Sequence, residues 1–494
     1  MKAKLLNIFR SRPVFLLLLP LFYMLHELNR NYAPGLTATA LLQVCIYTAI
    51  AVVFTFLVSF LLKSFQKAAI ITLLLLLFNF FFGTVHDIIR KKFGVSFFLS
   101  RYTVILAALL IVLIIVFTWL KKSKPKLDRF FLFLHVLLPV LILLELFTLL
   151  PKILKKDPYS KPALSSQFIS CDSCRKPDVY VIIADEYAGK QELQEVFSFD
   201  DSAFYSALQS RGFHVVNNST SNYNATVYSM ASLFNMDYIE LSGKNLVTQG
   251  DMLLCRNIIN NNSVGHFFQN NGYSIHNFSF FDVQGQRKAI TNYYFHPRSR
   301  ILNFGTFVNR FQRDVLPNYF SQKKWEAVEK NDYNNDETVD SLLRKLVTGK
   351  TGKPRFVYTH FTRPHQPYYV DRNGNFVNTW YNPRLGFEPI KKAYVDHVLY
   401  TNKRLLQLID LILDKSAQPP VILLASDHGF RQFPGMGEKK YYFMNLCSVY
   451  LPGGNYENFY DGLTPVNTFR VILNSQFGQR FPILKDSTSF LVEK

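Results

Sequence analysis

Two apolar stretches of the sequence run into side chains that can hold a metal ion. Residues 178–184 are followed by Asp185 and Glu186, and a second apolar stretch ends just before Asp427 and His428. Acids and an imidazole beside buried strands carry a large free-energy cost unless a cation pairs with them. Oxygen and nitrogen ligands of this kind suit Zn²⁺ or Mn²⁺. We therefore predict a divalent-metal site, with either Asp185 or Glu186 as its strand-end acid.

Thr226 is a candidate nucleophile for phosphorus. The pattern predicts a helix over 226–234 that begins at Thr226, and the free N–H groups of a helix start favour a phosphoryl anion. A threonine bound to a divalent metal loses its proton more easily and becomes a nucleophile. The alternative is that Thr226 is an N-cap residue without a chemical role.

A histidine-containing turn follows a third apolar stretch, 355–361. Its sequence is His360-Phe-Thr-Arg363-Pro-His365. His365 could protonate a leaving oxygen, and Arg363 could pair with a phosphate, with His360 as a further candidate for substrate binding. The alternative is that these are ordinary loop residues.

The elements that position these residues alternate along the chain. Strands are expected at 178–184, 213–216, 355–361 and 421–425, and a long helix at 388–415. A last helix begins at Thr464-Pro465. The continuous apolar strands predict an α/β domain with a central, mostly parallel sheet that is covered on both faces. In such sheets, ligands bind at the carboxyl ends of the strands.

The first third of the chain has the composition of a membrane domain. Stretches that are near the length of a bilayer-spanning helix occur at about 13–26, 38–62, 68–85, 102–120 and 130–150. The first is the shortest, and a cleaved signal peptide is its alternative, but no small-residue cleavage site follows it. We predict a five-helix transmembrane domain over 1–150, a connector over 151–176 and an exported domain over 177–494.

The charge is also unevenly divided. Residues 1–156 hold 19 Lys and Arg against four acids, a net +15 of the chain's +20. The remaining +5 gives no basic face for nucleic acid. A cytoplasmic N-terminus leaves eleven basic residues on the inner side and five in the opposite short loops, so we predict that orientation. The spans have few polar residues, which argues against a transporter.

The chain has five cysteines, and an exported compartment would favour disulfides between them. Cys171 and Cys174 form a Cys-x-x-Cys pair before the predicted domain, and Cys45 lies in a span. The pair is interpreted as a structural disulfide, closed within itself or with Cys255 or Cys447. A zinc ribbon would need a second such pair.

The chain resembles the alkaline phosphatase and sulfatase superfamily, in its membrane-anchored transferase branch. Four features carry the resemblance: the acids after the first strand, the threonine at a helix start, the histidine turn and the pair Asp427-His428. The resemblance covers nearly the whole chain, and its nearest layouts are those of lipoteichoic acid synthases and lipid A phosphoethanolamine transferases. It implies one metal, held by Asp185, Thr226, Asp427 and His428, with Thr226 as the nucleophile. Members of this branch have a single glutamate where this chain has the doublet Asp185-Glu186.

The resemblance implies an inner-membrane transferase with a phosphothreonine intermediate. It would move a phosphoethanolamine or phosphoglycerol group from a membrane phospholipid to an envelope lipid or glycan. A true sulfatase would carry Cys or Ser in a Cys/Ser-x-Pro-x-Arg signature, whereas Thr226 is followed by Tyr228 and Met230 at the matching positions. The alternatives are a phosphodiesterase or other hydrolase with the same site, and a non-catalytic protein that keeps the fold.

Overall fold

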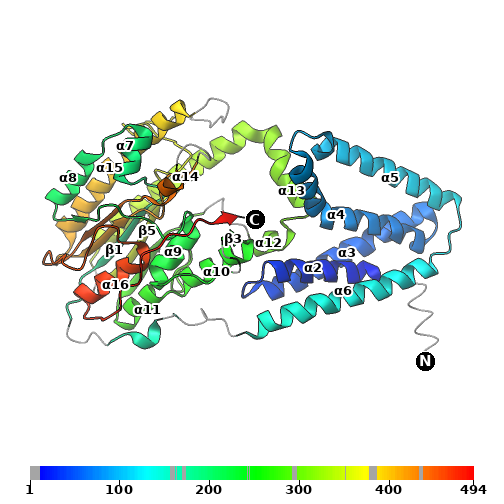
Figure 1. Cartoon of the computed structure of the whole chain (residues 1–494), viewed down its shortest axis with the longest axis horizontal. Helices are drawn as coiled ribbons and strands as arrows, with labels where there is room; N and C mark the ends of the chain where they lie inside the picture. The colour runs from blue at the N-terminus through cyan, green and yellow to red at the C-terminus, as the bar shows by residue number, and fades with distance from the viewer. Residues whose placement is uncertain are drawn as a thin grey trace. The chain divides into compact units, whose positions relative to one another are not determined.

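The computed structural model describes residues 12–155, 162, 164–169, 174–241, 243, 245–291, 297–350, 352–377, 387–432 and 438–493, without the side chains of 317–325 and 493. The chain divides into two compact units (Figure 1). The helical unit comprises Met1–Lys156 with Phe295–Ser321, and the sheet unit comprises Asp157–Tyr294 with Gln322–Lys494.

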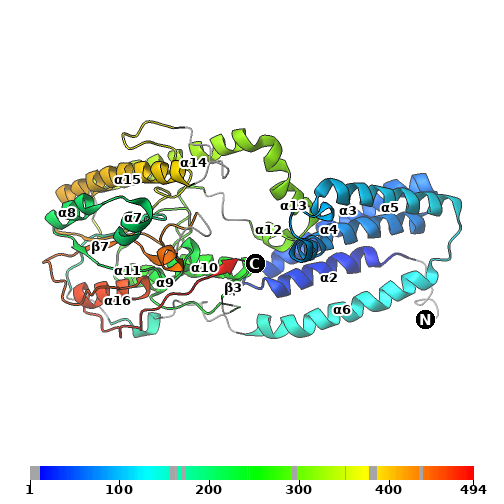
Figure 2. The ribbon, with the colours of Figure 1, turned by 45° about the horizontal axis from the view of Figure 1, so that its top comes forward.

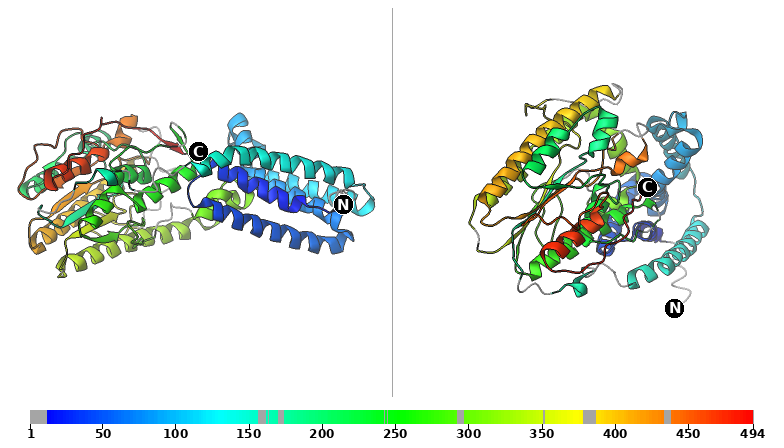
Figure 3. Two further views of the ribbon diagram at one scale, coloured as in Figure 1. Left: turned by 90° about the horizontal axis from the view of Figure 1, so that it is seen from below. Right: turned by 60° about the vertical axis from the view of Figure 1, so that its left-hand side comes forward.

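Five helices from the first third of the chain make up most of the helical unit, and they run lengthwise beside one another (Figure 3, left). They are α2 Phe15–Arg30, α3 Leu36–Leu62, α4 Phe65–Phe93, α5 Tyr102–Lys122 and α6 Asp128–Leu154. Among the described residues, α3, α4, α5 and α6 are long and apolar enough to cross a membrane. The helical unit therefore has the composition of a multi-pass membrane domain.

The prediction of five spans is corrected to four. Helix α2 has 16 residues, and it ends in the polar sequence His26-Glu-Leu-Asn29-Arg30. At 1.5 Å per residue it is about 24 Å long, which is less than the roughly 30 Å of a bilayer core. Instead, it is packed inside the unit, where Phe15, Leu19 and Tyr23 are almost completely buried.

A segment from far along the sequence also belongs to the helical unit. Helices α12 Arg298–Asn303 and α13 Phe307–Asp314 pack against α3 and α4. The Gly83 N–H donates to the Gly305 carbonyl at 2.9 Å. A Cβ at Gly83 would lie 2.4 Å from that oxygen, so this close approach requires glycine. The sequence pattern contained no sign of this insertion.

The sheet unit is built on a six-stranded sheet of order β2-β7-β6-β1-β5-β4. Its strands are β1 Val179–Ala184, β2 His214–Val215, β4 Ser274–Phe278, β5 Arg355–Phe361, β6 Val421–Ala425 and β7 Cys447–Tyr450. Strands β4, β5, β1 and β6 are parallel, and β7 and β2 add an antiparallel edge. The predicted mostly parallel sheet is thus confirmed. A small second sheet pairs β3 Leu246–Val247 with β8 Val492–Glu493.

Helices cover both faces of this sheet (Figures 1 and 2). One face carries α7 Lys190–Phe197, α8 Ser202–Ser210 and α15 Glu388–Lys415. The other carries α9 Thr226–Asn235, α10 Gln249–Asn260, α11 Ser263–Asn270 and α16 Pro465–Gln476 (Figure 3, right). Helix α14 Leu316–Thr348 precedes β5. All six side chains of β1 are fully buried, because this strand has neighbours on both sides and helices on both faces.

The register of the sheet determines which residues meet at its edge. Ala184 lies opposite Phe361 of β5, and Ile183 lies opposite Ala425 of β6. These three parallel strands therefore end at the same level. The residues that follow them, which include the predicted ligands, are brought to one edge of the sheet.

Candidate active site

Three predicted metal ligands meet at this edge of the sheet. A carboxylate oxygen of Asp185, a carboxylate oxygen of Asp427 and a ring nitrogen of His428 lie within 4.8 Å of one another, and all three residues are buried. Asp185 directly follows β1, and Asp427 and His428 follow β6 by one residue. Two carboxylates and an imidazole held this close are a donor set for a divalent cation.

Unsatisfied polar atoms in this cluster fit a bound cation. Within the described part of the chain, neither Asp185 Oδ1 nor Asp427 Oδ2 has a hydrogen-bond partner, although both oxygens are buried. The Nδ1 of His428 lies 2.8 Å from the Gly429 carbonyl, so it carries the proton and leaves the lone pair of Nε2 directed into the cluster. That Nε2 lies 3.3 Å from Asp427 Oδ2. A cation between these atoms would satisfy all three.

The two carboxylates differ in their proton affinity. Burial and the neighbouring Asp427 charge raise the pKa of Asp185 well above its usual range. Burial also opposes the charge of Asp427, but the imidazoles of His428 and His360, together with hydrogen bonds from the Glu186 N–H and the Thr226 hydroxyl, outweigh it and lower the pKa of Asp427 to about 2. Without a cation, the pair therefore favours a single negative charge.

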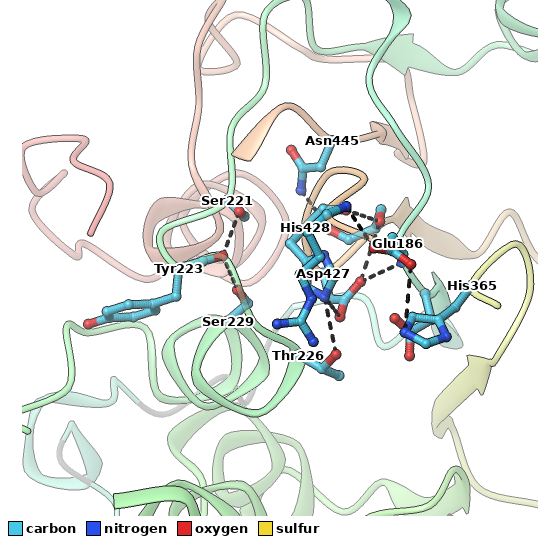
Figure 4. A network of polar contacts seen from close by, with 12 residues as sticks. Glu186, Ser221, Tyr223, Thr226, Ser229, His365, Asp427, His428 and Asn445 are labelled. Carbon is cyan, nitrogen blue, oxygen red and sulfur yellow. Dashed lines mark hydrogen bonds and ion pairs between the residues drawn. The ribbon is translucent and has the colours of Figure 1, made fainter. Parts of the chain in front are cut away.

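Thr226 lies directly beside this cluster (Figure 4). It is the first residue of α9, and its Oγ1 is 3.3 Å from His428 Nε2. The N-cap position is occupied by Ala225, so the threonine hydroxyl does not cap the helix. The N–H groups of the first turn and the hydroxyl thus occupy the same helix end, where an anion would be stabilised.

The loop before Thr226 is held by its own side chains and by the C-terminal segment. The Tyr223 carbonyl accepts hydrogen bonds from Ser221 Oγ at 2.7 Å and from Ser229 Oγ at 2.8 Å (Figure 4). The amide of Asn224 donates to the Leu491 carbonyl at 3.2 Å and accepts from the Leu491 N–H at 2.7 Å. These bonds determine where α9 begins and therefore where the hydroxyl of Thr226 lies.

Glu186 is turned away from the ligand cluster. Its backbone is in the left-handed region at φ 57°, and its N–H donates to Asp427 Oδ1 at 2.9 Å. Its carboxylate accepts from the Arg431 N–H at 2.8 Å and from Gln432 Nε2 at 2.7 Å. Asp185 thus points its carboxylate at the cluster, while both Glu186 oxygens have partners in the loop after β6.

His365 contacts this second acid. Its Nε2 lies 3.6 Å from Glu186 Oε2 and 3.1 Å from Gln432 Nε2, and its N–H donates to the Asp185 carbonyl at 3.0 Å. The imidazole is drawn beside Glu186 in Figure 4. The histidine turn and the metal-ligand cluster are therefore adjoining parts of one site.

His360 and Arg363 are buried below the site surface. His360 Nε2 lies 3.5 Å from Asp185 Oδ2, and burial lowers the pKa of His360 to about 4, so its ring is neutral. The Arg363 guanidinium is 3.9 Å from Asp336 and 3.8 Å from Glu337, both on α14. The charged partners of Arg363 therefore belong to α14.

Two residues of the site escaped the sequence analysis. Gln432 joins Glu186 to His365. Asp336 of α14 accepts from the Thr362 N–H at 2.7 Å and the Arg363 N–H at 3.1 Å, and thereby holds the histidine turn. Neither residue lies in a motif. For Asp336, the one available signal is an acid on the apolar face of a long helix.

The cysteine pairing is partly resolved. Cys174 is disulfide-bonded, whereas Cys45, Cys255 and Cys447 are free thiols. Cys171 lies outside the described residues. Of the predicted pairings, those that involve Cys255 or Cys447 are thus excluded.

Comparisons with known proteins place the site in a family context. The sequence profile of the sulfatase family matches residues 179–476, which include every predicted site residue. No curated protein matches the chain. Solved structures with a similar fold include the integral membrane protein lipooligosaccharide phosphoethanolamine transferase A from Neisseria meningitidis, with 12% identity, a TM-score of 0.40 and coverage of 95% of both chains.

Two further structures are similar over part of the chain. The C-terminal periplasmic domain of EptC from Escherichia coli has 12% identity and a TM-score of 0.41, and covers 65% of this chain and 91% of its own. A protein of glycosaminoglycan metabolism from Bacteroides thetaiotaomicron has 13% identity and a TM-score of 0.37, and covers 63% and 79%. Similarities at this level do not distinguish one function from another. The match of the family profile over 179–476 therefore decides to which family the chain is assigned.

Proposed function

This chain belongs to the sulfatase family of enzymes, and we propose that within that family it is a membrane-bound, metal-dependent transferase. It would move a phospho-alcohol group, of the phosphoethanolamine or phosphoglycerol type, from a phospholipid to an acceptor in the cell envelope. Thr226 would carry the group as a phosphothreonine between the two half-reactions.

One observation carries the proposal. The hydroxyl of Thr226 lies at a helix start, 3.3 Å from His428 Nε2, beside the three buried ligands Asp185, Asp427 and His428. These ligands and Thr226 would hold one divalent cation, Zn²⁺ or Mn²⁺, with Asp185 rather than Glu186 as the strand-end acid. When bound, the cation lowers the pKa of the Thr226 hydroxyl and offsets charge on the phosphoryl group.

The residues of the chain would perform the transfer as follows. Thr226 first loses its hydroxyl proton to solvent. Its Oγ then forms a bond to phosphorus while the bond from phosphorus to the diacylglycerol oxygen breaks, and His365 gives a proton to that oxygen so that diacylglycerol leaves. An acceptor hydroxyl then gives its proton to His365 and displaces Thr226 from phosphorus. The N–H groups at the start of α9 stabilise the phosphoryl oxygens in both steps.

The membrane helices support a lipid donor. A site tethered to the bilayer meets a donor that is confined to two dimensions at a raised effective concentration. We propose that the basic loops at 63–67 and 121–129 are cytoplasmic, so that α6 ends on the outer side of the inner membrane, where the sheet unit lies. A cytoplasmic N-terminus then requires that α2, although too short to be a span by itself, runs through the bilayer packed among the four spans. The proposed domain boundaries remain 1–150, 151–176 and 177–494, with 295–321 folded onto the helical unit.

Mass spectrometry of the Thr226 peptide tests the proposal. Full-length protein is isolated with native lipids, with a Thr226→Ala preparation alongside and a Ser202→Ala preparation as a matched hydroxyl control. We expect a phosphoethanolamine or phosphoglycerol adduct that is absent only from Thr226→Ala. Free phospho-alcohol at full turnover without an acceptor would instead indicate a hydrolase. Bound metal with neither adduct nor turnover would contradict both activities.

A further inference from the structure

The hairpin of α12 and α13 gives the helical unit a set of arginines that the proposed chemistry does not use. Segment 295–321 contains Arg298, Arg300, Arg310 and Arg313 but a single acid, Asp314. We refer to these four arginines, with the helices that carry them, as the arginine hairpin.

The arginine hairpin is fixed to one end of the membrane helices by polar contacts. Tyr47 OH of α3 donates to Asn303 Oδ1 at 2.8 Å, and Tyr102 OH of α5 donates to Asp314 Oδ2 at 2.7 Å. Arg310 forms an ion pair with Asp87 near the end of α4. At this same end of the bundle, α6 ends and the chain continues into the sheet unit.

The length of α4 between its two charged ends gives the depth of the arginine hairpin in a bilayer. At its other end, Lys67 Nζ donates to the Leu120 and Ser123 carbonyls at 2.7 Å each, so Lys67 marks one boundary of the apolar region. Asp87 follows 20 residues later, about 30 Å along the helix, which equals the hydrocarbon thickness. Arg310, paired with Asp87, is therefore level with the lipid headgroups.

The apolar side of the arginine hairpin faces the membrane helices. The ring of Phe307 lies 4.9 Å from that of Phe78 and 5.1 Å from that of Phe82, both on α4. The Phe311 ring lies 6.3 Å from that of Tyr102. Such a short amphipathic element, apolar toward the bundle and cationic at headgroup level, is typical of the membrane interface.

Three guanidinium groups gather at this level. Arg310 and Arg313 both lie over the Phe304 ring, at 5.9 Å and 4.8 Å from its centroid. Half-buried Arg300 has no acidic partner among the described residues, and burial together with the Arg313 charge lowers the pKa of Arg300. Three cations are thus held near one another with two acids, Asp87 and Asp314.

An orphaned polar group lies under the same hairpin. The Tyr23 side chain is 2% exposed, and its hydroxyl has no hydrogen-bond partner in the described part of the chain. A Cβ on Gly305, between α12 and α13, would lie 3.9 Å from that hydroxyl. Arg310 Nε is likewise buried without an acceptor. Together, the excess positive charge and these unused donors fit an anionic, acceptor-rich ligand.

We infer that the arginine hairpin binds the phosphate of a membrane phospholipid, with Arg300 and Arg313 as its principal contacts. A phosphodiester headgroup supplies one negative charge and acceptor oxygens at the depth where these arginines lie, and guanidinium groups bind phosphate in pairs of hydrogen bonds. The arginine hairpin belongs to the helical unit and Thr226 to the sheet unit, and none of the contacts that hold the hairpin involves Thr226, so a Thr226→Ala protein keeps it. The failure of the proposed transfer would therefore leave this inference intact.

Native mass spectrometry of the full-length protein in a maltoside detergent tests the inference. Dihexanoylphosphatidylethanolamine is titrated into wild type, R300Q/R313Q and R300K/R313K, with K121Q/K122Q at the opposite end of α5 as the charge-matched control. Loss of two charge-assisted contacts should weaken binding by at least about tenfold in R300Q/R313Q. The lysine variant should retain part of the affinity, and the control should bind as wild type does.

Three results would overturn the inference. R300Q/R313Q could bind the lipid as tightly as the wild type does. Dihexanoylglycerol, which lacks phosphate, could compete equally well, which would indicate an acyl-chain groove. Inorganic phosphate could displace the lipid at equal concentration, which would indicate a site for the free anion. Wild-type melting temperatures for both arginine variants establish that a loss of binding is not a loss of fold.

Discussion

At the scale of single residues, the site depends on which way two adjacent acids point. Asp185 follows β1 in regular geometry and its carboxylate enters the ligand cluster. Glu186 adopts φ 57°, which turns its carboxylate to the Arg431 N–H and to Gln432. A conformation that favours glycine has a cost for glutamate, and the contacts of its carboxylate offset that cost.

Substitution of these two acids should therefore have different effects on metal content. Asp185→Asn removes a charged ligand, and we expect bound Zn²⁺ or Mn²⁺ to fall at least tenfold by elemental mass spectrometry. Glu186→Gln keeps the shape of a side chain outside the cluster and should retain metal within about twofold, with reduced turnover because His365 loses the negative charge beside it. Equal metal loss in both variants would refute this distinction.

At the scale of elements, the start of α9 is positioned by a segment more than 260 residues away. The two hydrogen bonds between Asn224 and the Leu491 backbone are joined by one from the Asn222 amide to the Ser487 carbonyl at 3.0 Å. Helix α16 holds the same segment, because Asn467 Nδ2 donates to the Leu484 carbonyl at 2.8 Å. Asn467 thus helps to hold the C-terminal segment that positions the start of α9.

Asn224→Ala should accordingly reduce catalysis without affecting the metal. It leaves a buried N–H and a buried carbonyl of Leu491 unpaired, which costs about 2 kcal/mol of stability. A small shift of Thr226 should lower kcat by about tenfold. Turnover, thermal unfolding and metal content are measured together, with exposed Asn270→Ala as the control. Unchanged kcat in a destabilised protein would limit Asn224 to a role in folding.

The histidine turn is supported from α15, and this support has a pH dependence. His397 is fully buried, its Nδ1 lies 3.3 Å from the Pro364 carbonyl, and burial lowers the pKa of His397 to about 3. The unfolded chain, with a pKa of about 6.5, binds more protons between pH 3 and pH 6.5. The free energy of unfolding therefore falls as the pH is lowered through that window.

At pH 5, this single proton lowers the stability of the wild type by about 2 kcal/mol relative to pH 7. His397→Gln should abolish that part of the acid sensitivity, so its melting temperature should change less between pH 7 and pH 5. His266→Gln on α11 is the control. Parallel melting curves for wild type and His397→Gln across this range would show that His397 does not contribute.

At the scale of the whole molecule, the sheet-unit sequence contains a piece of the membrane domain. Segment 295–321 places Phe307 and Phe311 against α4 and α5, although it lies between strands β4 and β5 of the sheet. Helix α14, which follows, carries Asp336 and holds the histidine turn. Along the chain, the segment that packs on the membrane helices is thus followed directly by the helix that supports the histidine turn of the active site.

A fragment of residues 174–494 should then expose the apolar side of α13. We expect it to self-associate without detergent, as measured by sedimentation velocity, because no membrane helix covers Phe307 and Phe311. F307S/F311S should return the fragment to a monomer, whereas Phe376→Ser at an exposed site should not. A monodisperse wild-type fragment in detergent-free buffer would contradict this role for α13.

The sequence alone determined the parts of this protein that depend on local pattern. The strands at 355–361 and 421–425 and the helix at 388–415 have the predicted bounds, because a run of apolar β-branched residues or a 3.6-residue period specifies them locally. The sequence also predicts that Asp185, Asp427 and His428 lie close together, because parallel strands end at the same edge of a sheet, and the structure has them there.

Tertiary structure alone decided what depends on long-range packing. The length of α2, the return of 295–321 to the membrane helices and the support of Thr226 by residue 491 have no local signature. The orientation of the Asp185 and Glu186 carboxylates is of the same kind, because one backbone dihedral and two distant hydrogen-bond donors turn Glu186 toward the loop after β6. Periodicity records which face of an element is buried, but the partner that buries it is chosen only when the whole chain folds.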